Sequence, residues 1–204
     1  MKKIVAMIAV MAMVSVSALA QTFGVKAGVN IANIKYSGSG MNISPDSKVG
    51  LAVGAFAKFD ITEAFVIQPE LLYSEKGAKL DISEGGERYK STMKLNYLSI
   101  PVIAKYYVAE GFSLQAGPQF DFLLSAKEDW DATIGGMSES GEDDIKEDVT
   151  GLDFGLALGL GYEFTSGLGI DGRYIIGLSE LADNPEEGVD TKSKGFQFTL
   201  SYSF

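Results

Sequence analysis

The stretch that decides the fold runs from Thr150 to Phe164 and reads TGLDFGLALGLGYEF. From Leu152 to Phe164 every second residue is bulky and apolar, and the residues between them are glycine, alanine or an acid. Side chains of a strand alternate between its two faces, so this period of two predicts a strand with one apolar face and one face of small or polar residues. The segments 196–204 and 23–31 repeat the alternation.

Eight segments of this kind follow one another, at roughly 22–36, 48–60, 64–76, 93–107, 112–125, 149–164, 168–179 and 194–204. The connections 61–63, 108–111 and 165–167 are short, whereas 37–47, 77–92, 126–148 and 180–193 are long and polar. Bacterial outer-membrane barrels alternate short periplasmic turns with long extracellular loops in this way. The sequence therefore predicts an all-β fold, an eight-stranded antiparallel transmembrane β-barrel with both termini on the short-turn side.

The orientation of the two faces separates a membrane barrel from a soluble one. An eight-stranded interior is narrow, and it holds glycine and small polar groups more easily than a bulky apolar residue from every strand. We therefore expect the bulky face to contact lipid. Aromatic residues at the strand ends near the short turns, such as Phe23, Tyr107 and Phe164, are expected to form an interfacial girdle. A soluble, lipocalin-like ligand binder remains the alternative fold.

Three prolines interrupt the predicted strands, at Pro69, Pro101 and Pro118. Proline cannot donate to a strand ladder, and a closed barrel has no edge strand to hold it, so each is expected at a bulge or a local break. A bulge or break at Pro101 would decide which residues of segment 93–107 face outward. The preferred register directs Leu98, Ile100, Val102, Ala104 and Tyr106 outward.

The first 20 residues are typical of a secretory signal peptide. Lys2 and Lys3 precede an apolar run over 4–16, and Ala18-Leu19-Ala20 offers a cleavage site. That run is short for a membrane-spanning helix, which needs about 20 apolar residues. We therefore expect residues 1–20 to be removed on export and residues 21–204 to form the barrel domain.

Composition excludes several kinds of chemistry. The chain has no Cys and no His, so it lacks disulfides, thiolate metal sites and the commonest catalytic base and metal ligand. It carries 27 acidic residues against 17 basic ones, two of which lie in the leader, so a nucleic-acid partner is disfavoured. No phosphate-binding motif is present, and no S-x-x-K motif stands at the start of a helix, although composition does not exclude a serine–lysine dyad. The sequence predicts no enzymatic activity, no cofactor and no metal site.

The expected parity directs a set of charged side chains into the lumen. Isolated burial of a charge costs several kcal/mol, so these groups must pair with one another or be wetted. We expect a structural network around Glu70, Lys105, Asp121, Asp153, Asp171 and Arg173, joined by Lys26, Lys58 and Glu163. Glycines 28, 54, 117, 155, 159 and 161 leave room in the lumen, which keeps a thin water or ion path as the alternative.

The connection 126–148 is strongly acidic, with nine Asp and Glu residues against Lys127 and Lys146. A solvated, mobile loop is the simplest interpretation. The spacing of a calcium-binding loop is absent, which leaves weak cation capture as an open question. Trp130, the chain's one Trp, lies between Asp129 and Asp131, where a binding role is equally open.

Ordered blocks of the sequence resemble the PorT-like outer-membrane β-barrel family, often labelled "porin family". The blocks are Ile67 to Ser74, Tyr97 to Val102, Ala116 to Gln119, Phe23 to Asn30 and Phe196 to Phe204. The resemblance implies an eight-stranded barrel of the OmpA/OmpX kind in a bacterial outer membrane, without agreed catalytic residues. Ser99 departs from the acidic residue expected there, which puts an interior ion pair at that position in doubt. The terminal Phe204 resembles the signal read by the outer-membrane assembly machinery.

These observations leave two main functions for a membrane barrel, with an enzyme acting on lipid or an envelope polymer as the least favoured third. The preferred interpretation is a structural or surface-interaction role through acidic extracellular loops, and the alternative is a narrow porin-like channel for ions or small solutes. The expected partners are outer-membrane lipid and, during biogenesis, the assembly machinery. The sequence does not identify an extracellular partner.

Overall fold

The computed structural model describes residues 22–38, 41–43, 45–182 and 189–204. The predicted signal peptide, residues 1–20, lies outside these ranges. No helix in the described part of the chain is long and apolar enough to cross a membrane. The described residues contain ten strands: β1 (Thr22–Gly38), β2 (Met41–Ile43), β3 (Asp46–Asp60), β4 (Phe65–Glu84), β5 (Glu87–Ala109), β6 (Phe112–Ile134), β7 (Met137–Asp144), β8 (Leu152–Glu163), β9 (Leu168–Gly177) and β10 (Val189–Ser203).

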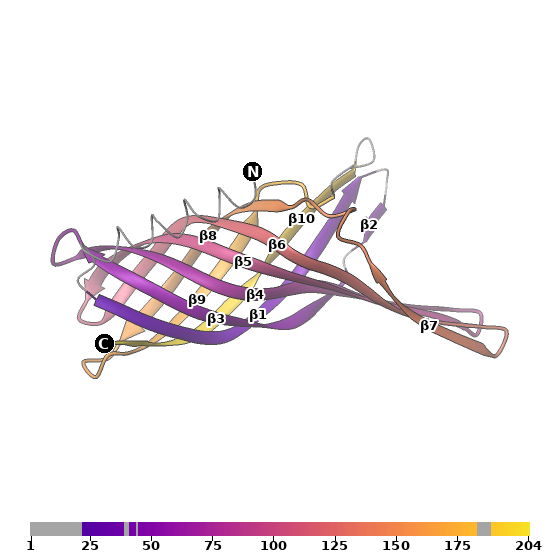
Figure 1. Cartoon of the computed structure of the whole chain (residues 1–204), viewed down its shortest axis with the longest axis horizontal. Helices are drawn as coiled ribbons and strands as arrows, with labels where there is room; N and C mark the ends of the chain where they lie inside the picture. The colour runs from indigo at the N-terminus through magenta and orange to yellow at the C-terminus, as the bar shows by residue number, and fades with distance from the viewer. Residues whose placement is uncertain (1–21, 39–40, 44, 183–188) are drawn as a thin grey trace.

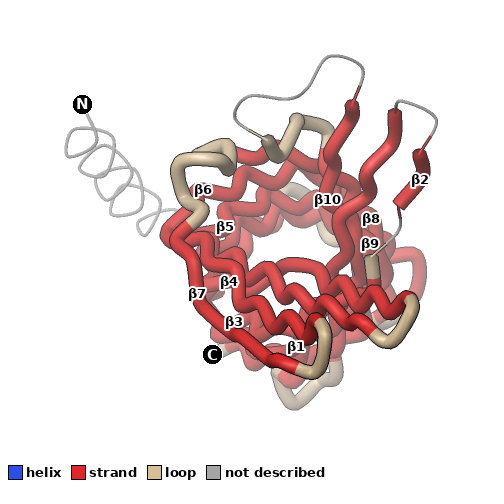
Figure 2. Tube along the Cα trace, turned by 90° about the vertical axis from the view of Figure 1, so that its right-hand side faces the viewer, coloured by secondary structure: helices blue, strands red, loops and turns tan. Residues whose placement is uncertain are grey.

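Eight of these strands form a closed antiparallel ring, as Figure 2 shows in an end-on view. The order around the ring is β1, β3, β4, β5, β6, β8, β9 and β10, and pairing of β10 with β1 closes it. The closing ladder runs without interruption from Gly24–Ser203 to Gly38–Val189. The short strands β2 and β7 pair outside the ring, with β1 and β6 respectively. The predicted eight-stranded barrel is thus confirmed.

Two of the predicted long loops are instead continuations of strands. The segments 77–92 and 126–148 were expected to be loops, but β4 and β5 run on to a tight turn at Gly85-Gly86, and β6 and β7 meet at Gly135-Gly136. All four glycines have positive φ, between 59° and 90°, which suits two-residue hairpin turns. In Figure 1 both hairpins project beyond one end of the barrel, opposite the end that carries the C-terminus.

The prolines interrupt pairing without shifting it. Between β4 and β5 the ladder stops after Pro69–Val102 and resumes at Leu72–Ser99 in the same register. Between β5 and β6 it stops at Pro101–Gln119 and resumes at Ala104–Ala116, again in register. The expected local breaks are present. The two register shifts between β5 and β6 lie away from the prolines: Leu124 has no partner between Tyr97–Leu123 and Asn96–Ser125, and Val108 has none between Tyr107–Ser113 and Ala109–Phe112.

The outer surface of the ring is apolar, as predicted. Leu158, Phe198 and Leu200 are 42%, 49% and 63% exposed, while Asp153 and Gln197, of the opposite parity, are 1% exposed. Along β8 the outward apolar residues extend from Leu152 to Tyr162. At about 3.4 Å per residue and a tilt of about 40°, they cover roughly 25 Å, the height of the apolar band of an outer-membrane barrel.

The aromatic residues near the short turns mostly follow the girdle prediction. Phe23, Tyr106, Tyr162 and Phe204 are exposed on the outer surface. The prediction is wrong for Tyr107, whose hydroxyl donates a hydrogen bond of 3.1 Å to Glu163 at the mouth of the lumen. The outward position belongs to its neighbour Tyr106, because β5 keeps the parity in which Lys105 points inward.

Candidate functional site

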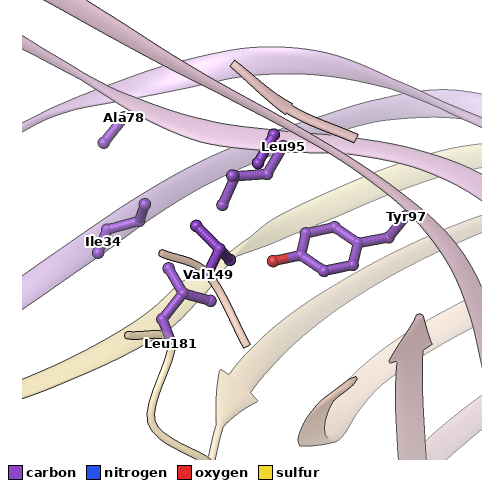
Figure 3. Close-up of a cluster of buried hydrophobic side chains, with 7 residues drawn as sticks. Ile34, Ala78, Leu95, Tyr97, Val149 and Leu181 are labelled. Atoms are coloured by element: carbon purple, nitrogen blue, oxygen red, sulfur yellow. The ribbon is translucent and has the colours of Figure 1, made fainter. Parts of the chain in front are cut away.

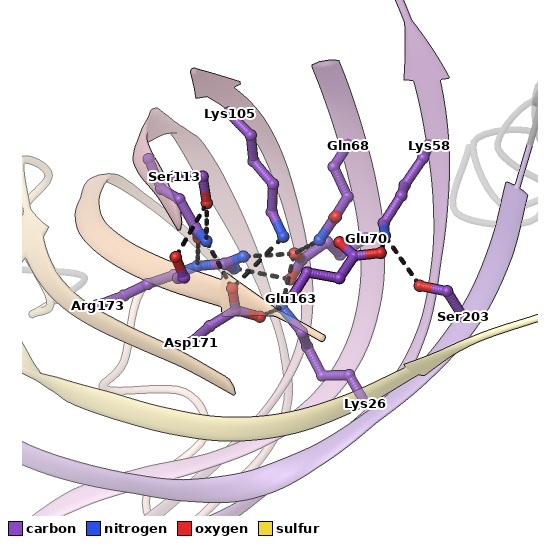
Figure 4. Close-up of polar contacts among 12 residues, drawn as sticks. Lys26, Lys58, Gln68, Glu70, Lys105, Ser113, Glu163, Asp171, Arg173 and Ser203 are labelled. Carbon is purple, nitrogen blue, oxygen red and sulfur yellow. Dashed lines mark hydrogen bonds and ion pairs between the residues drawn. The ribbon is translucent and has the colours of Figure 1, made fainter. Parts of the chain in front are cut away.

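The centre of the lumen is filled by a charged network drawn from five strands of the ring, β1, β4, β5, β6 and β9 (Figure 4). Lys26 of β1 contacts both Glu70 of β4 and Asp171 of β9, at 2.9 Å and 3.0 Å. Lys105 of β5 reaches the other oxygen of Asp171 at 3.4 Å. All of these side chains are nearly or fully excluded from solvent. Each of these four buried charges therefore has an opposite charge within contact distance, which offsets the cost of burial.

Arg173 makes three hydrogen bonds within this central network. Its Nη1 and Nη2 donate to the two oxygens of Glu70 at 2.8 Å and 2.7 Å, and its Nε donates to Gln115 Oε1 at 2.8 Å. Gln115 in turn donates to Asp171 at 2.5 Å, and Gln68 donates to Glu70 at 2.6 Å. The planar guanidinium thus uses three donors at once, which fixes both its position and its orientation.

A second polar layer lies nearer the projecting hairpins, around Asp121 of β6. Lys76 Nζ lies 2.5 Å from Asp121 Oδ2, Gln119 donates to both carboxylate oxygens at 3.0 Å, and Ser99 donates to Oδ1. At position 99, where the ion pair was doubted, Ser99 makes a hydrogen bond in its place, and the ion pair of this layer joins Lys76 and Asp121. Asp153, which pairs with Asp121 across β6 and β8, instead accepts hydrogen bonds from Ser179 and from Ser193 at 2.9 Å.

A third polar group stands at the mouth beside the short turns. Lys58 contacts Glu163 at 2.5 Å and Ser203 at 2.9 Å, which links β3, β8 and β10. Glu163 is more exposed than the central acids, with 28% of its side chain accessible. An open hollow of about 440 Å³ lies here, lined by Thr22, Asp60, Thr62, Glu63 and Val66 together with Lys58, Tyr107 and Glu163.

The opposite end of the lumen is closed by apolar side chains, which the sequence reasoning did not predict. Ile34, Leu95, Tyr97, Val149 and Leu181 are between 0% and 8% exposed and pack into one cluster (Figure 3). Val149 and Leu181 come from connections that fold back across the barrel, held by a hydrogen bond from Thr150 N to Leu181 O. We call this cluster, with Ala78 and Ala126, the apolar plug.

The glycines expected to widen the lumen have a different role. A Cβ at Gly28 would lie 1.9 Å from Phe198 O, and one at Gly54 would lie 2.0 Å from Leu71 O. At these inward positions the backbone of the neighbouring strand occupies the space that a side chain needs. At Gly161 the space is taken by Gln115 and Asp171. These glycines therefore let strands and network side chains approach closely.

All six residues of the predicted lumen network point inward and are at most 5% exposed. The structure joins Glu70, Lys105, Asp171 and Arg173 in one network but places Asp121 and Asp153 in the second layer. Sequence reasoning missed Lys76, Gln68, Gln115 and Gln119. The inward parity that selected Glu70 and Asp121 applies to them as well, and it would have found them.

The acidic connection 126–148 is largely ordered as β6, β7 and a following turn. Trp130 of β6 packs against Gly141 of β7, where an added Cβ would lie 2.8 Å from the indole ring. Its Nε1 donates to Asp143 at 2.8 Å. Among the described residues, no group of three or more acidic side chains is placed to hold a metal ion.

A closed antiparallel ring with an apolar outside and a charged, side-chain-filled inside defines an integral membrane β-barrel. Residues 19–183 match the family model described as "Outer membrane protein beta-barrel domain", and the chain belongs to this family. It is therefore an integral β-barrel protein of the bacterial outer membrane. The soluble, lipocalin-like alternative is excluded.

Solved structures of small outer-membrane barrels are similar to this chain. Ail, the attachment invasion locus protein of Yersinia pestis, shows 14% identity and a TM-score of 0.49 over 90% of this chain and 99% of its own. Neisserial surface protein A shows 14% identity and a TM-score of 0.44 over 89% and 97%. OprG from Pseudomonas aeruginosa shows 10% and 0.41 over 91% and 96%. No curated protein matches the sequence.

Proposed function

We propose that this protein is a closed, PorT-like barrel that acts by presenting an extracellular surface to other molecules. In this proposal it neither catalyses a reaction nor conducts solutes. Its partners in the membrane are outer-membrane lipid and, during biogenesis, the assembly machinery that reads Phe204. The extended hairpins β4–β5 and β6–β7 provide the surface.

The observation that carries the proposal is the filling of the lumen. Glu70, Arg173 and Asp121 are 1–3% exposed, and the apolar plug closes the lumen above them. Near Asn30, Lys76 and Ser193 the described residues leave a space of only about 20 Å³. A space of this size holds about one water molecule, which is too little for a solute path.

Planar-bilayer recording of the purified protein tests the proposal. We expect no steady, ion-selective current, because conduction would require the central ion pairs and the plug to separate together. Reproducible ion-selective conductance that changes in Arg173→Ala would overturn the proposal in favour of a narrow channel. Arg88→Ala is the matched control, because Arg88 lies outside the lumen on the β4–β5 hairpin.

A further inference from the structure

The two projecting hairpins join into one four-stranded sheet. It comprises residues 77–84, 87–96, 125–134 and 137–144, with continuous ladders between β4 and β5, β5 and β6, and β6 and β7. We call it the extracellular sheet. Directly paired residues share a face and successive residues alternate, so the ladders assign every position to one of two faces.

The outer face of the extracellular sheet continues the lipid-facing side of the barrel and is charged. It carries five basic and five acidic residues: Lys79, Arg88, Lys90, Lys94, Lys127, Asp81, Asp129, Asp131, Glu142 and Asp144. Three ion pairs join them, Arg88–Asp81, Lys94–Asp129 and Lys127–Glu142. This face is therefore neutral overall, with much of its charge already paired.

The inner face continues the lumen-facing side, and its lower part belongs to the apolar plug through Ala78, Leu95 and Ala126. Above the plug it remains apolar, with Leu80, Ile82, Tyr89, Met93, Trp130, Ala132, Ile134 and Met137. Ile82, Tyr89, Ile134 and Met137 are 49%, 39%, 60% and 78% exposed. A contiguous apolar surface of this kind outside a membrane typically marks an interaction site.

The charge of the inner face has one sign only. Between residues 78 and 143 the sheet directs Glu87, Glu128, Glu139 and Asp143 to this face, and among the described residues it directs no Lys or Arg there above the plug. Ser91 donates a hydrogen bond to Glu128, and Trp130 donates one to Asp143. Burial, and then the negative charges of Glu128 and Asp143, raise the pKa of the Tyr89 phenol. The carboxylates are thus held next to aromatic rings.

We propose that the inner face of the extracellular sheet docks a cationic, amphipathic polypeptide segment of an external partner. Lys or Arg side chains of that segment pair with Glu128, Glu139 and Asp143 and lie over Tyr89 and Trp130, while its apolar side chains cover Ile82, Ile134 and Met137. Aromatic faces and unpaired carboxylates both attract cations. A second copy of this chain fits poorly, because its own inner face carries the same negative charge. The inference rests on the proposed surface function and names the partner class.

Trp130 provides a local reporter, because it is the chain's one Trp and lies on the inner face. The refolded protein in uncharged maltoside micelles is titrated with a short synthetic leucine–lysine peptide, and with leucine–glutamine and leucine–glutamate analogues. We expect a saturable change in Trp130 fluorescence with the leucine–lysine peptide alone. The triple variant Glu128→Gln, Glu139→Gln, Asp143→Asn should bind it about tenfold or more weakly.

The matched control carries three neutral substitutions on the outer face of the same strands, Asp129→Asn, Asp131→Asn and Glu142→Gln. It changes the net charge equally and should bind as the unmodified protein does. In the inner-face variant the carboxamide oxygens can still accept the hydrogen bonds from Ser91 and Trp130, so the fold is preserved.

Three results would overturn the inference: no saturable response, equal weakening in both triple variants, or an equal response to calcium ions alone. Any of these results in a barrel that does not conduct would refute the docking surface and leave the proposed function intact. Ion-selective conductance would refute the proposed function itself.

Discussion

Glu70 and Arg173 lie 103 positions apart in the sequence and form a bidentate ion pair across the lumen, with N–O distances of 2.8 Å and 2.7 Å. The first prediction concerns this pair. Arg173→Gln or Glu70→Gln alone leaves one buried charge without its main partner, so each should lower the free energy of unfolding by about 3–5 kcal/mol. The double variant should lose clearly less than the sum of the two single losses. Urea unfolding in lipid vesicles measures all three, and additive losses would contradict the coupling.

The second prediction is that depth in the lumen determines the effect of breaking a pair. Lys58 contacts Glu163 at the mouth, where 28% of the Glu163 side chain is accessible to water. Lys58→Met should therefore lower the free energy of unfolding by about 1 kcal/mol or less, because water can solvate the remaining carboxylate. The same unfolding assay compares it with Arg173→Gln. An equal loss in the two variants would show that the mouth is not hydrated.

The barrel itself was predictable because lipid imposes a simple rule on its outer face. From Leu152 to Phe164, bulky apolar residues alternate with small or polar ones because every second side chain contacts acyl chains. The same rule holds near the prolines, where Leu98 and Tyr106 point outward as expected. Above the membrane that rule no longer applies. There, outward positions such as Lys94 and Lys127 are charged. In β6 the unpaired Leu124 also shifts the alternation by one residue, so the apolar period of two is interrupted. For these reasons the segments 77–92 and 126–148 were interpreted as loops.

A local feature could have identified the two hairpins. Gly85-Gly86 and Gly135-Gly136 are glycine pairs suited to two-residue turns, and each lies near the middle of a segment interpreted as a loop. The apolar plug is different. Ile34, Leu95, Val149 and Leu181 come from separate segments and meet only after the ring has closed. The pairing of Lys26 with Glu70 likewise depends on the stagger of the strands around the ring, which periodicity does not reveal.

The third prediction tests the close approach of strands at inward glycines. A Cβ at Gly54 would lie 2.0 Å from the backbone oxygen of Leu71, so Gly54→Ala forces two paired strands apart. We expect a loss larger than the roughly 1–3 kcal/mol of ordinary overpacking, because backbone cannot move aside as a side chain can. Unboiled gel samples should show little compact, heat-modifiable barrel. Gly151→Ala is the control, since nothing lies within 4 Å of its added Cβ, and it should migrate as the unmodified protein does.

The fourth prediction separates assembly from stability at the C-terminus. Phe204 is 71% exposed on the outer surface, so Phe204→Ala removes few contacts within the barrel. If the assembly machinery reads this residue, the variant should accumulate in the outer membrane much more slowly in cells. Its unfolding curve after refolding in vitro should shift little. Phe198→Ala is the comparison, as an exposed aromatic residue of β10 away from the terminus. Equal slowing of the two variants would contradict a terminal recognition role.

The fifth prediction concerns pH and the β4–β5 hairpin. Arg88 donates two hydrogen bonds to Asp81, and these bonds, followed by the positive charge of Arg88, hold the pKa of the Asp81 carboxyl below its usual range. Because the pKa is lowered in the folded state, the pairing stabilises the hairpin fully at pH values above the ordinary pKa of Asp81. This contribution is lost as the pH falls through the lowered pKa. NMR titration of the Asp81 carboxyl carbon should show the low midpoint, and Arg88→Gln should move it upward towards the ordinary value. Lys127→Gln, which removes a base from the neighbouring β6–β7 hairpin, should leave the midpoint nearly unchanged. If both variants moved it equally, the shift would come from the overall charge of the extracellular sheet and not from this pair.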